Sequence, residues 1–283
     1  MSIKLIASDV DGTILNTPHT GLISPRNKAA IDAARSRGIT VSIATGRGNA
    51  AALQFAHSLG LDGPVISSNG ACVSDGKTIY AKHCLPDQTL MDALAFGKEY
   101  RCIPIFFTHI CLFFPTDEEG GENVGDYVCK WLGTCEADEE MRPMPPSMRE
   151  EVFHGLGVTK ILFACETQEY ANALRPVWED LVAKGEIPDL ADVVVSYHNS
   201  FDLAVRGVSK GTAVAELVQA LGLKREEVFA IGDNENDTGM FEYAGVSVAM
   251  GHSKDSVKEK ATYVTDTVVG DGFAKALEQY VLK

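Results

Sequence analysis

Two aspartates separated by one residue follow the first apolar run of the chain, in Asp9-Val10-Asp11-Gly12-Thr13. Residues two apart on an extended strand project to the same side. One carboxylate can therefore attack phosphorus while the second acts as an acid and then as a base. Gly12 would let the backbone bend close to a phosphate. Taken alone, this run is better explained as a strand that ends in a solvated Asp-Gly turn.

A second polar segment, Ala44-Thr45-Gly46-Arg47, follows another apolar run. A hydroxyl and backbone N–H groups at the start of a helix can bind a phosphate, although alone Thr45 would be a simple helix cap. Gly46-Arg47-Gly48 also begins a G-x-G-x-x-A match, which is the pattern of dinucleotide binding. That match favours a competing hypothesis, a nicotinamide-dependent oxidoreductase. The fingerprint normally follows the first strand, however, and no acidic residue ends the next strand here.

Two further segments come near the C-terminal end of the chain. Lys210 stands at the start of a predicted helix, where an ammonium opposes the helix dipole unless it faces a phosphate or a carboxylate. The run Gly232-Asp233-Asn234-Glu235-Asn236-Asp237 follows a buried strand. Its side-chain oxygens suit a hard cation such as Mg²⁺. Without a functional site, Lys210 would be an exposed lysine and the acidic run would be an Asx-rich helix cap. Four unrelated structural features at one edge of one sheet are a poorer explanation than a single site.

Each of the four segments lies at the end of a short apolar run, predicted to be a strand, or at the start of one of the helical patterns that separate these runs. The predicted strands of the two outer parts are residues 3–8, 39–44, 64–67, 228–231 and 246–249. Helices are predicted from Ser24-Pro25 to Gly38 and over residues 49–59, 210–221 and 236–244. This alternation predicts right-handed βαβ units and a parallel sheet. Ligands of such sheets bind at the carboxyl ends of the strands, where all four segments fall.

The middle of the chain has a different pattern. Strands are predicted around Ile79 and over residues 103–107, 112–114, 158–164 and 193–197, with helices over 90–100, 124–132 and 168–184. The acidic, proline-containing stretch 136–151 is predicted to be a loop or the edge of a lid. We therefore expect residues 1–83 and 200–283 to form a Rossmann-like core, and residues 84–199 to form an inserted α/β domain.

The composition limits the possible partners. The chain has 283 residues, 45% hydrophobic and 23% charged, with a formal net charge of −14. This acidity argues against nucleic acid as a partner, and no apolar run is long enough to span a bilayer. Seven scattered cysteines and a carboxylate as early as Asp9 predict reduced thiols and a cytoplasmic location. A site for an anionic substrate must supply its own cation. The oligomeric state, monomer or weak homodimer, stays open.

The four segments resemble, in chain order, the motifs of the haloacid dehalogenase superfamily, specifically its Cof-type phosphatases. Ser68-Asn69-Gly70-Ala71 and Phe201-Asp202-Leu203 resemble the same subgroup, whereas Asn234 stands where its members usually have Gly. The resemblance implies a Rossmann-like core that carries catalysis and a cap inserted between Arg47 and Lys210. It also implies a Mg²⁺-dependent phosphomonoester hydrolase acting on small phosphorylated metabolites, such as a sugar phosphate or a phosphorylated cofactor.

The resemblance further implies a role for each site residue. Asp9 would attack phosphorus and form a phospho-aspartate, and Asp11 would carry the proton. Thr45 and Gly46 would bind phosphoryl oxygens with Gly12 and Arg47 nearby, Lys210 would neutralise charge, and Asn236 would contact a substrate oxygen. Mg²⁺ would bind the Asp9 carboxylate, the Asp11 carbonyl and Asp233, with Asp237 bonded to metal waters or to Lys210.

Two alternatives to hydrolysis stay open. A phosphomutase of the same fold would return the phosphoryl group to a substrate, and such enzymes use an arginine-rich cap. Arg142, Arg149 and Arg175 are dispersed along the middle of the chain and form no evident cluster. The second alternative is the oxidoreductase that the Gly46-x-Gly48 turn would indicate. The residues that select the substrate are not evident, with Tyr197, His198 and Asn199 as polar candidates.

Overall fold

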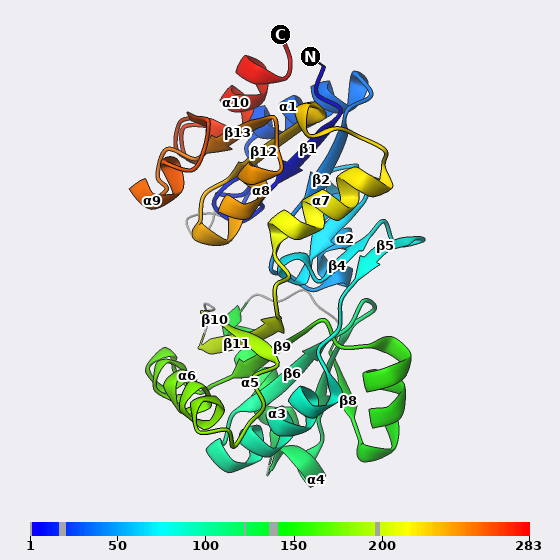
Figure 1. Cartoon of the computed structure of the whole chain (residues 1–283), viewed down its shortest axis with the longest axis vertical. Coiled ribbons are helices and arrows are strands. Elements are labelled where there is room, and N and C mark those ends of the chain that lie inside the picture. Colours follow the sequence, from blue (N-terminus) through cyan, green and yellow to red (C-terminus); the bar gives the residue numbers. More distant parts are fainter. Residues whose placement is uncertain (1, 17–20, 122, 136–140, 196–198) are drawn as a thin grey trace. The chain divides into compact units, whose positions relative to one another are not determined.

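Apolar runs from both ends of the chain form one parallel sheet. The computed structural model describes residues 2–16, 21–121, 123–135, 141–195 and 199–283 (Figure 1). Five strands lie in the order β14-β13-β12-β1-β2, and each neighbouring pair is parallel. They are β1 (Leu5–Ser8), β2 (Thr40–Ile43), β12 (Val228–Gly232), β13 (Val246–Ala249) and β14 (Tyr263–Val264). The predicted parallel α/β sheet is confirmed.

Helices pack on both faces of this sheet. One face packs against α1 (Pro25–Ser36), α2 (Asn49–Ser58) and α10 (Gly272–Tyr280), through buried residues such as Ile31 and Phe273. The other face packs against α7 (Lys210–Ala220), α8 (Thr238–Glu242) and α9 (Asp255–Lys258), through residues such as Leu217 and Met240. Both faces of the strands are therefore apolar, which is why they appear as unbroken hydrophobic runs in the sequence.

The strand order reverses beside β1. From β1 the chain passes through α1 to β2 on one side, while β12 pairs with β1 on the other side, with Ser8 level with both Ile43 and Ile231. The carboxyl ends of β1, β2 and β12 consequently lie at the same edge. A parallel sheet opens a crevice at such a switch point.

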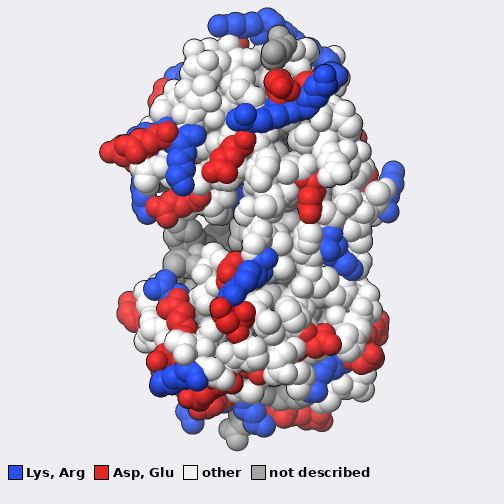
Figure 2. All heavy atoms as spheres, in the orientation of Figure 1, with Lys and Arg blue, Asp and Glu red and all other residues white. Residues whose placement is uncertain are grey.

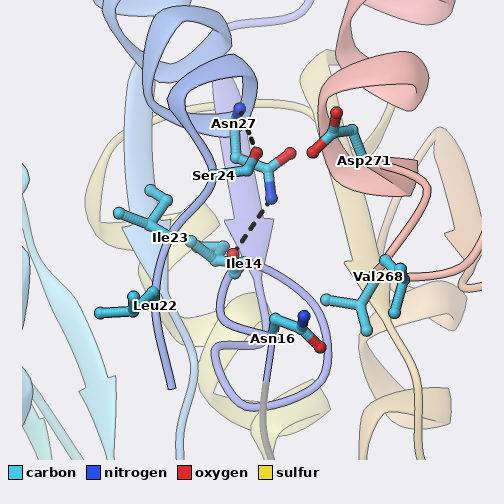
Figure 3. A pocket seen from close by; sticks show the side chains of 9 residues that line it. Ile14, Asn16, Leu22, Ile23, Ser24, Asn27, Val268 and Asp271 are labelled. Atoms are coloured by element: carbon cyan, nitrogen blue, oxygen red, sulfur yellow. Dashed lines mark hydrogen bonds between the residues drawn. The ribbon is translucent and has the colours of Figure 1, made fainter. Parts of the chain in front are cut away.

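The loop after β1 is anchored to α1. Ser24 caps this helix by accepting a hydrogen bond from the Asn27 N–H, as the Ser-Pro pair predicts. The buried Asn27 amide donates to the Ile14 carbonyl at 3.1 Å (Figure 3). The same amide accepts from the Ala274 N–H. A small pocket lies beside this network, and none of the predicted site residues lines it. Asn27 thus has a structural role, holding the chain just beyond the two aspartates.

A small sheet and a broken helix complete this part of the chain. Strands β3 (Val65–Ser67), β4 (Cys72–Ser74) and β5 (Ile79–Lys82) form a three-stranded sheet, with a 3₁₀ turn, Ser68–Gly70, between β3 and β4. The helix predicted over residues 236–244 is instead a 3₁₀ turn at Glu235–Asp237 followed by α8. The Asp237 side chain accepts from the backbone N–H groups of Asp233 and Asn234 just before this turn, which delays the start of the regular helix.

The middle of the chain forms a second sheet with the order β10-β11-β9-β6-β7-β8. Its strands are β6 (Ile103–Phe107), β7 (Leu112–Pro115), β8 (Met141–Met144), β9 (Lys160–Ala164), β10 (Ala191–Val195) and β11 (Ser200–Val205). One face packs against α3 (Asp87–Tyr100) and α6 (Gln168–Ala183), and the other against α5 (Val124–Cys135). A short helix α4 (Asp117–Gly120), the 3₁₀ turn η2 (Pro146–Met148) and a π-helical segment Glu151–Leu156 connect these elements.

The middle of the chain differs from expectation in one element. Residues 136–151 were expected to be a loop or the edge of a lid, but Met141–Met144 forms β8, paired in parallel with β7, and residues 136–140 lie outside the described part of the chain. Pro143 is compatible with this strand because β8 lies at the edge of the sheet. Side chains alternate between the two faces of a strand, so a sheet with one solvated face would expose one phenylalanine of each pair at 106–107 and 113–114. Both faces of the sheet are covered instead, and Phe106, Phe107 and Phe113 are all buried.

The chain divides into two compact units. The first comprises Met1–Arg47, Ala52–Ala81 and Val208–Lys283, and the second comprises Gly48–Ala51 and Lys82–Gly207. The expected boundaries were 83/84 and 199/200. The second boundary differs because β11 pairs antiparallel with both β9 and β10, so the sheet of the second unit extends to Val205.

Charged residues of both signs are interspersed over the visible surface. On the face drawn in Figure 2, neither sign gathers into one continuous patch among the coloured residues. None of the helices in the described part of the chain has the length and apolar character of a segment that crosses a membrane. The cysteines at 72, 84, 102, 111 and 165 are free thiols.

Candidate active site

A buried lysine lies at the centre of the candidate site. Lys210 is the first residue of α7, and its side chain is 2% exposed. Its Nζ donates to Asp9 Oδ1 at 2.6 Å and to Asp237 Oδ1 at 2.7 Å. The predicted lysine, nucleophile and metal-binding segments therefore meet in three dimensions, although Lys210 and Asp9 are 201 residues apart in the sequence.

Local structure brings Lys210 to this position. Ser209 caps α7 and forms a reciprocal capping box with Thr212, which fixes where the helix begins. Gly211 follows Lys210 in the chain, and a Cβ on it would lie 2.5 Å from the backbone of Gly239 in α8. The two helices consequently pack backbone against backbone, which holds Lys210 beside Asp237. A side chain at Gly211 would push them apart.

Three carboxylates surround the single lysine. Oxygens of Asp9, Asp233 and Asp237 all lie within 4.8 Å of one another. Asp9 Oδ2 is buried and has no hydrogen-bond donor among the described residues. One ammonium leaves this cluster with an excess of negative charge, and oxygen-rich clusters of that kind suit a divalent cation such as Mg²⁺. The donor set and the unsatisfied oxygen both fit the predicted magnesium.

The electrostatics of the cluster reflect its burial. Burial raises the pKa of Asp9 well above its ordinary value, and the neighbouring Asp237 carboxylate adds to the effect while Lys210 opposes it. Burial and Asp237 likewise raise the pKa of Asp233. Burial alone would lower the pKa of Lys210, but the Asp237 and Asp9 carboxylates outweigh it and raise that pKa. The lysine is therefore a permanent cation, whereas the carboxylates need further positive charge to remain ionised together.

Asp237 is fully engaged with the protein. Its Oδ1 accepts from Lys210, and its Oδ2 accepts from the backbone N–H groups of Asp233 and Asn234, each at 3.0 Å. A Cβ on Gly232 would lie 2.4 Å from the Asp237 Cβ, so only glycine leaves room for this arrangement. Of the two predicted partners of Asp237, the structure shows Lys210.

Asp233 packs directly on the backbone of the first motif. A Cβ on Gly12 would lie 2.6 Å from Asp233 Oδ2, and Gly12 has a φ of +88°. Gly12 was predicted to make room for a phosphate, and here it makes room for a carboxylate. His252 Nε2 lies 3.5 Å from Asp233 Oδ2. The Val268 N–H donates to His252 Nδ1. Sequence patterns did not single out His252, because a lone histidine in a loop carries no signal of its own.

Arg47 pairs with Asp11. The guanidinium donates to both Asp11 oxygens, at 2.7 and 3.1 Å, and lies over the Phe55 ring at 5.5 Å. Asp11 therefore separates from Asp9: its carboxylate faces Arg47, and it is absent from the acidic cluster. Arg47, predicted to lie near the phosphate, contacts the predicted proton carrier, Asp11.

The Thr45–Gly46 segment lies one strand away from Asp9. Thr45 is buried, and its Oγ1 accepts from the Arg47 N–H at 3.2 Å. Ala44 donates its N–H to the Ser8 carbonyl, so the ends of β1 and β2 are level. Asn236 is exposed, and its amide donates to Asn69 Oδ1 at 3.4 Å. In the sequence, the family resemblance marks Asn69 only as part of Ser68-Asn69-Gly70-Ala71, and the Asn-Gly pair directly after a strand is the local signal for it.

Of the polar candidates at residues 197–199, the described residues include Asn199. Tyr197 and His198 lie outside the described residues. Asn199 belongs to the second unit, where its N–H donates to Gln168 Oε1 and its amide donates to the Glu166 carbonyl. These bonds give Asn199 a structural role next to α6.

Known proteins resemble this chain along its whole length. Residues 6–277 match the family described as haloacid dehalogenase-like hydrolase. A Bacillus subtilis protein named 5-amino-6-(5-phospho-D-ribitylamino)uracil phosphatase is 30% identical over 283 residues, covering 100% of this chain and 97% of its own. The pyridoxal phosphate phosphatase of Escherichia coli is 28% identical, covering 99% of this chain and 98% of its own.

A solved structure of a haloacid dehalogenase-like hydrolase shares the fold of this chain. The crystal structure of a haloacid dehalogenase-like hydrolase from Bacteroides thetaiotaomicron superposes with a TM-score of 0.81 at 26% identity. The match covers 98% of this chain and 99% of that one. Both units of the chain, and not only the parallel sheet, are therefore shared with this protein.

Proposed function

The chain belongs to the haloacid dehalogenase-like hydrolase family, and on that premise we propose that it hydrolyses phosphate monoesters of small metabolites through a phospho-aspartate on Asp9. The resemblance predicted from the motifs is confirmed, and the chain is a phosphatase. Membership of this family leaves the oxidoreductase alternative without support. The observation that carries the proposal is the buried bridge from Lys210 to Asp9 and Asp237.

Asp9 is the proposed nucleophile. Lys210 holds one of its oxygens, and the other, Oδ2, has no donor among the described residues and is available for bonding. In the first step an Asp9 oxygen bonds to phosphorus, the bond from phosphorus to the leaving oxygen breaks, and Asp11 gives that oxygen a proton. In the second step water attacks phosphorus, its proton goes to Asp11, and the bond to Asp9 breaks with release of phosphate.

Arg47 has a supporting role in the proton transfers. Its two hydrogen bonds fix the plane of the Asp11 carboxyl group and so orient the group that exchanges the proton. Thr45 and Gly46 are proposed to bind phosphoryl oxygens, and Asn236 to contact a substrate oxygen. Phosphoryl transfer depends mainly on such positioning and on neutralisation of the equatorial charge.

The acidic cluster is the proposed magnesium site. Asp9, Asp233 and the Asp11 carbonyl would hold the ion, and Asp237 would support it from behind through Lys210 and the backbone of Asp233. When bound, Mg²⁺ supplies the positive charge that lets Asp9 stay ionised next to a phosphate dianion. The charge count supports this assignment, because Lys210 alone does not balance three carboxylates.

The proposed substrates are sugar phosphates, sugar-alcohol phosphates and phosphorylated cofactors. This choice follows the relatives, one named for a phosphoribityl compound and the other for pyridoxal phosphate. The second unit, Lys82–Gly207 with Gly48–Ala51, is proposed to form a cap that selects among them. The sheet of the second unit and the helices on both of its faces form a separate compact unit, as an inserted cap requires.

A screen over phosphorylated metabolites tests the function. Wild-type protein with Mg²⁺ should release inorganic phosphate from members of these classes, and chelation should stop the release. Asp9→Asn should lower the rate at least about a thousandfold. The matched control is Asp62→Asn, an exposed aspartate of the same unit, which should keep wild-type activity. Wild-type rates in Asp9→Asn would exclude Asp9 as the nucleophile, and phosphoryl transfer to a second metabolite without phosphate release would indicate a mutase.

A further inference from the structure

A strained turn lies beside the proposed phosphate site. Ser68, Asn69 and Gly70 have φ values of 50°, 55° and 109°, three left-handed residues in succession. Left-handed backbone costs roughly 1 kcal/mol for a residue with a Cβ, and such residues gather where function requires the strain. Ser68 is nevertheless 2% exposed, so surrounding structure holds the turn in place.

The backbone of this turn holds the Thr45–Arg47 segment. The Asn69 N–H donates to the Thr45 carbonyl at 3.0 Å, and the Ser68 N–H donates to the Arg47 carbonyl at 2.8 Å. In a trans peptide the carbonyl and the following N–H point in opposite directions. Because the Thr45 carbonyl faces the turn, the Gly46 N–H faces away from it. The left-handed turn thereby sets the direction of an N–H that a phosphate cradle needs.

The Asn69 side chain links two further parts of the site. Its Oδ1 accepts from the Asn236 amide at 3.4 Å, and a Cβ placed on Gly46 would lie 3.1 Å from the same oxygen. Gly70, the next residue, lies so close to the start of α7 that a Cβ there would be 2.2 Å from the Ser209 carbonyl. The turn therefore contacts the Thr45–Arg47 segment, the start of the Lys210 helix and Asn236.

We propose that Asn69 is a positioning residue of the phosphate site, its amide orienting Asn236 and its left-handed backbone orienting the Thr45–Arg47 segment. The inference rests on the proposed function, since it assigns a role within the same site. Asparagine suits both tasks, because its short polar side chain tolerates the left-handed region and also accepts the Asn236 amide.

Asn69→Gly separates the side chain from the backbone, because glycine keeps the left-handed turn and removes only the amide. The measurement is calorimetric binding of inorganic phosphate in the presence of Mg²⁺, with the KM and kcat of a good substrate where turnover exists. Asn69→Gly should weaken phosphate binding about fivefold, the effect of one lost hydrogen bond, and raise KM more than it lowers kcat. Asn123→Gly is the matched control, an exposed left-handed asparagine (φ 60°) of the second unit that should bind phosphate normally.

A double-mutant cycle distinguishes positioning from general stability. If Asn69 acts through Asn236, then Asn69→Gly should weaken binding less than twofold in an Asn236→Ala background. Full additivity with Asn236→Ala, or unchanged phosphate binding by Asn69→Gly, would overturn the inference. Absence of turnover by the wild type would instead count against the proposed function, and the phosphate-binding cycle would still decide the role of Asn69.

Discussion

Each unit of the molecule buries a lysine beside a carboxylate, and the two lysines differ in their surroundings. Lys160, on β9, is 5% exposed and lies 3.1 Å from Asp202 on β11, with its Nζ 4.1 Å from the centre of the Phe107 ring. Lys210 is 2% exposed and its ammonium contacts two carboxylates, those of Asp9 and Asp237, with Asp233 as a third nearby. The pair in the second unit balances in charge, whereas the cluster in the first unit does not.

The imbalance is what distinguishes a site from a structural pair. A balanced buried pair needs no further ion to neutralise it, and replacing it by apolar residues is often neutral for stability. A cluster of three carboxylates around one ammonium is unfavourable without another cation, and proteins keep such arrangements at functional sites. Position adds to the difference, because Lys160 lies within a sheet while Lys210 begins a helix at the carboxyl edge of the parallel strands.

The largest expected difference is in catalysis. Lys210→Met should lower kcat at least about a hundredfold, because it removes the fixed positive charge beside Asp9. Lys160→Met should instead leave Asp202 buried without its cation and destabilise the protein by about 3–5 kcal/mol. Steady-state kinetics and urea unfolding of both variants check the contrast. The double variant Lys160→Met/Asp202→Leu should recover most of the lost stability, and its failure to do so would show that this pair is more than a balanced ion pair.

A smaller difference is expected in the response to Mg²⁺. An ion that binds only the folded protein adds about 2–3 kcal/mol of stability when its concentration exceeds Kd about a hundredfold. Wild-type protein should therefore melt at a higher temperature with Mg²⁺ than with a chelator. Asp233→Asn should lose most of that increase, while Asp202→Asn should keep it although its starting stability is lower. Equal responses of the two variants in differential scanning fluorimetry would argue against a metal at Asp233.

The smallest effect concerns an exposed charge cluster of the second unit. His154 lies between Asp87 and Glu150, and hydrogen bonds to both raise its pKa, with Asp87 the larger cause. A raised histidine pKa contributes stability that is fully present below the unfolded value, about 6.5, and is lost as pH rises through the folded value. Wild-type protein should therefore exceed His154→Gln slightly in urea midpoint at pH 5.5 and match it at pH 8.5. A difference at pH 8.5 alone would reverse the sign and contradict this assignment.

Much of the site was predictable because its parts are local patterns. Asp9 and Asp11 follow a buried strand, Ser24-Pro25 and Ser209 cap helices, and the acidic run from Asp233 follows another strand. Each pattern depends on neighbours within a few residues, so the sequence alone identifies it. The parallel sheet followed from the same local alternation of strand and helix, and its carboxyl edge predicted that the motifs meet.

Asp9-x-Asp11, the Lys210 helix and the acidic turn were thus determined by the sequence, while the tertiary structure decided which side chains touch. The pairing of Arg47 with Asp11, the bond from Lys210 to Asp237, the packing of Asp233 on Gly12 and the place of Asn69 all join residues far apart in the chain. The extension of the second sheet through β11 and β8 was decided in the same way. The physical reason is that contacts between distant segments depend on how helices and strands pack, and no local pattern of residue types records that packing.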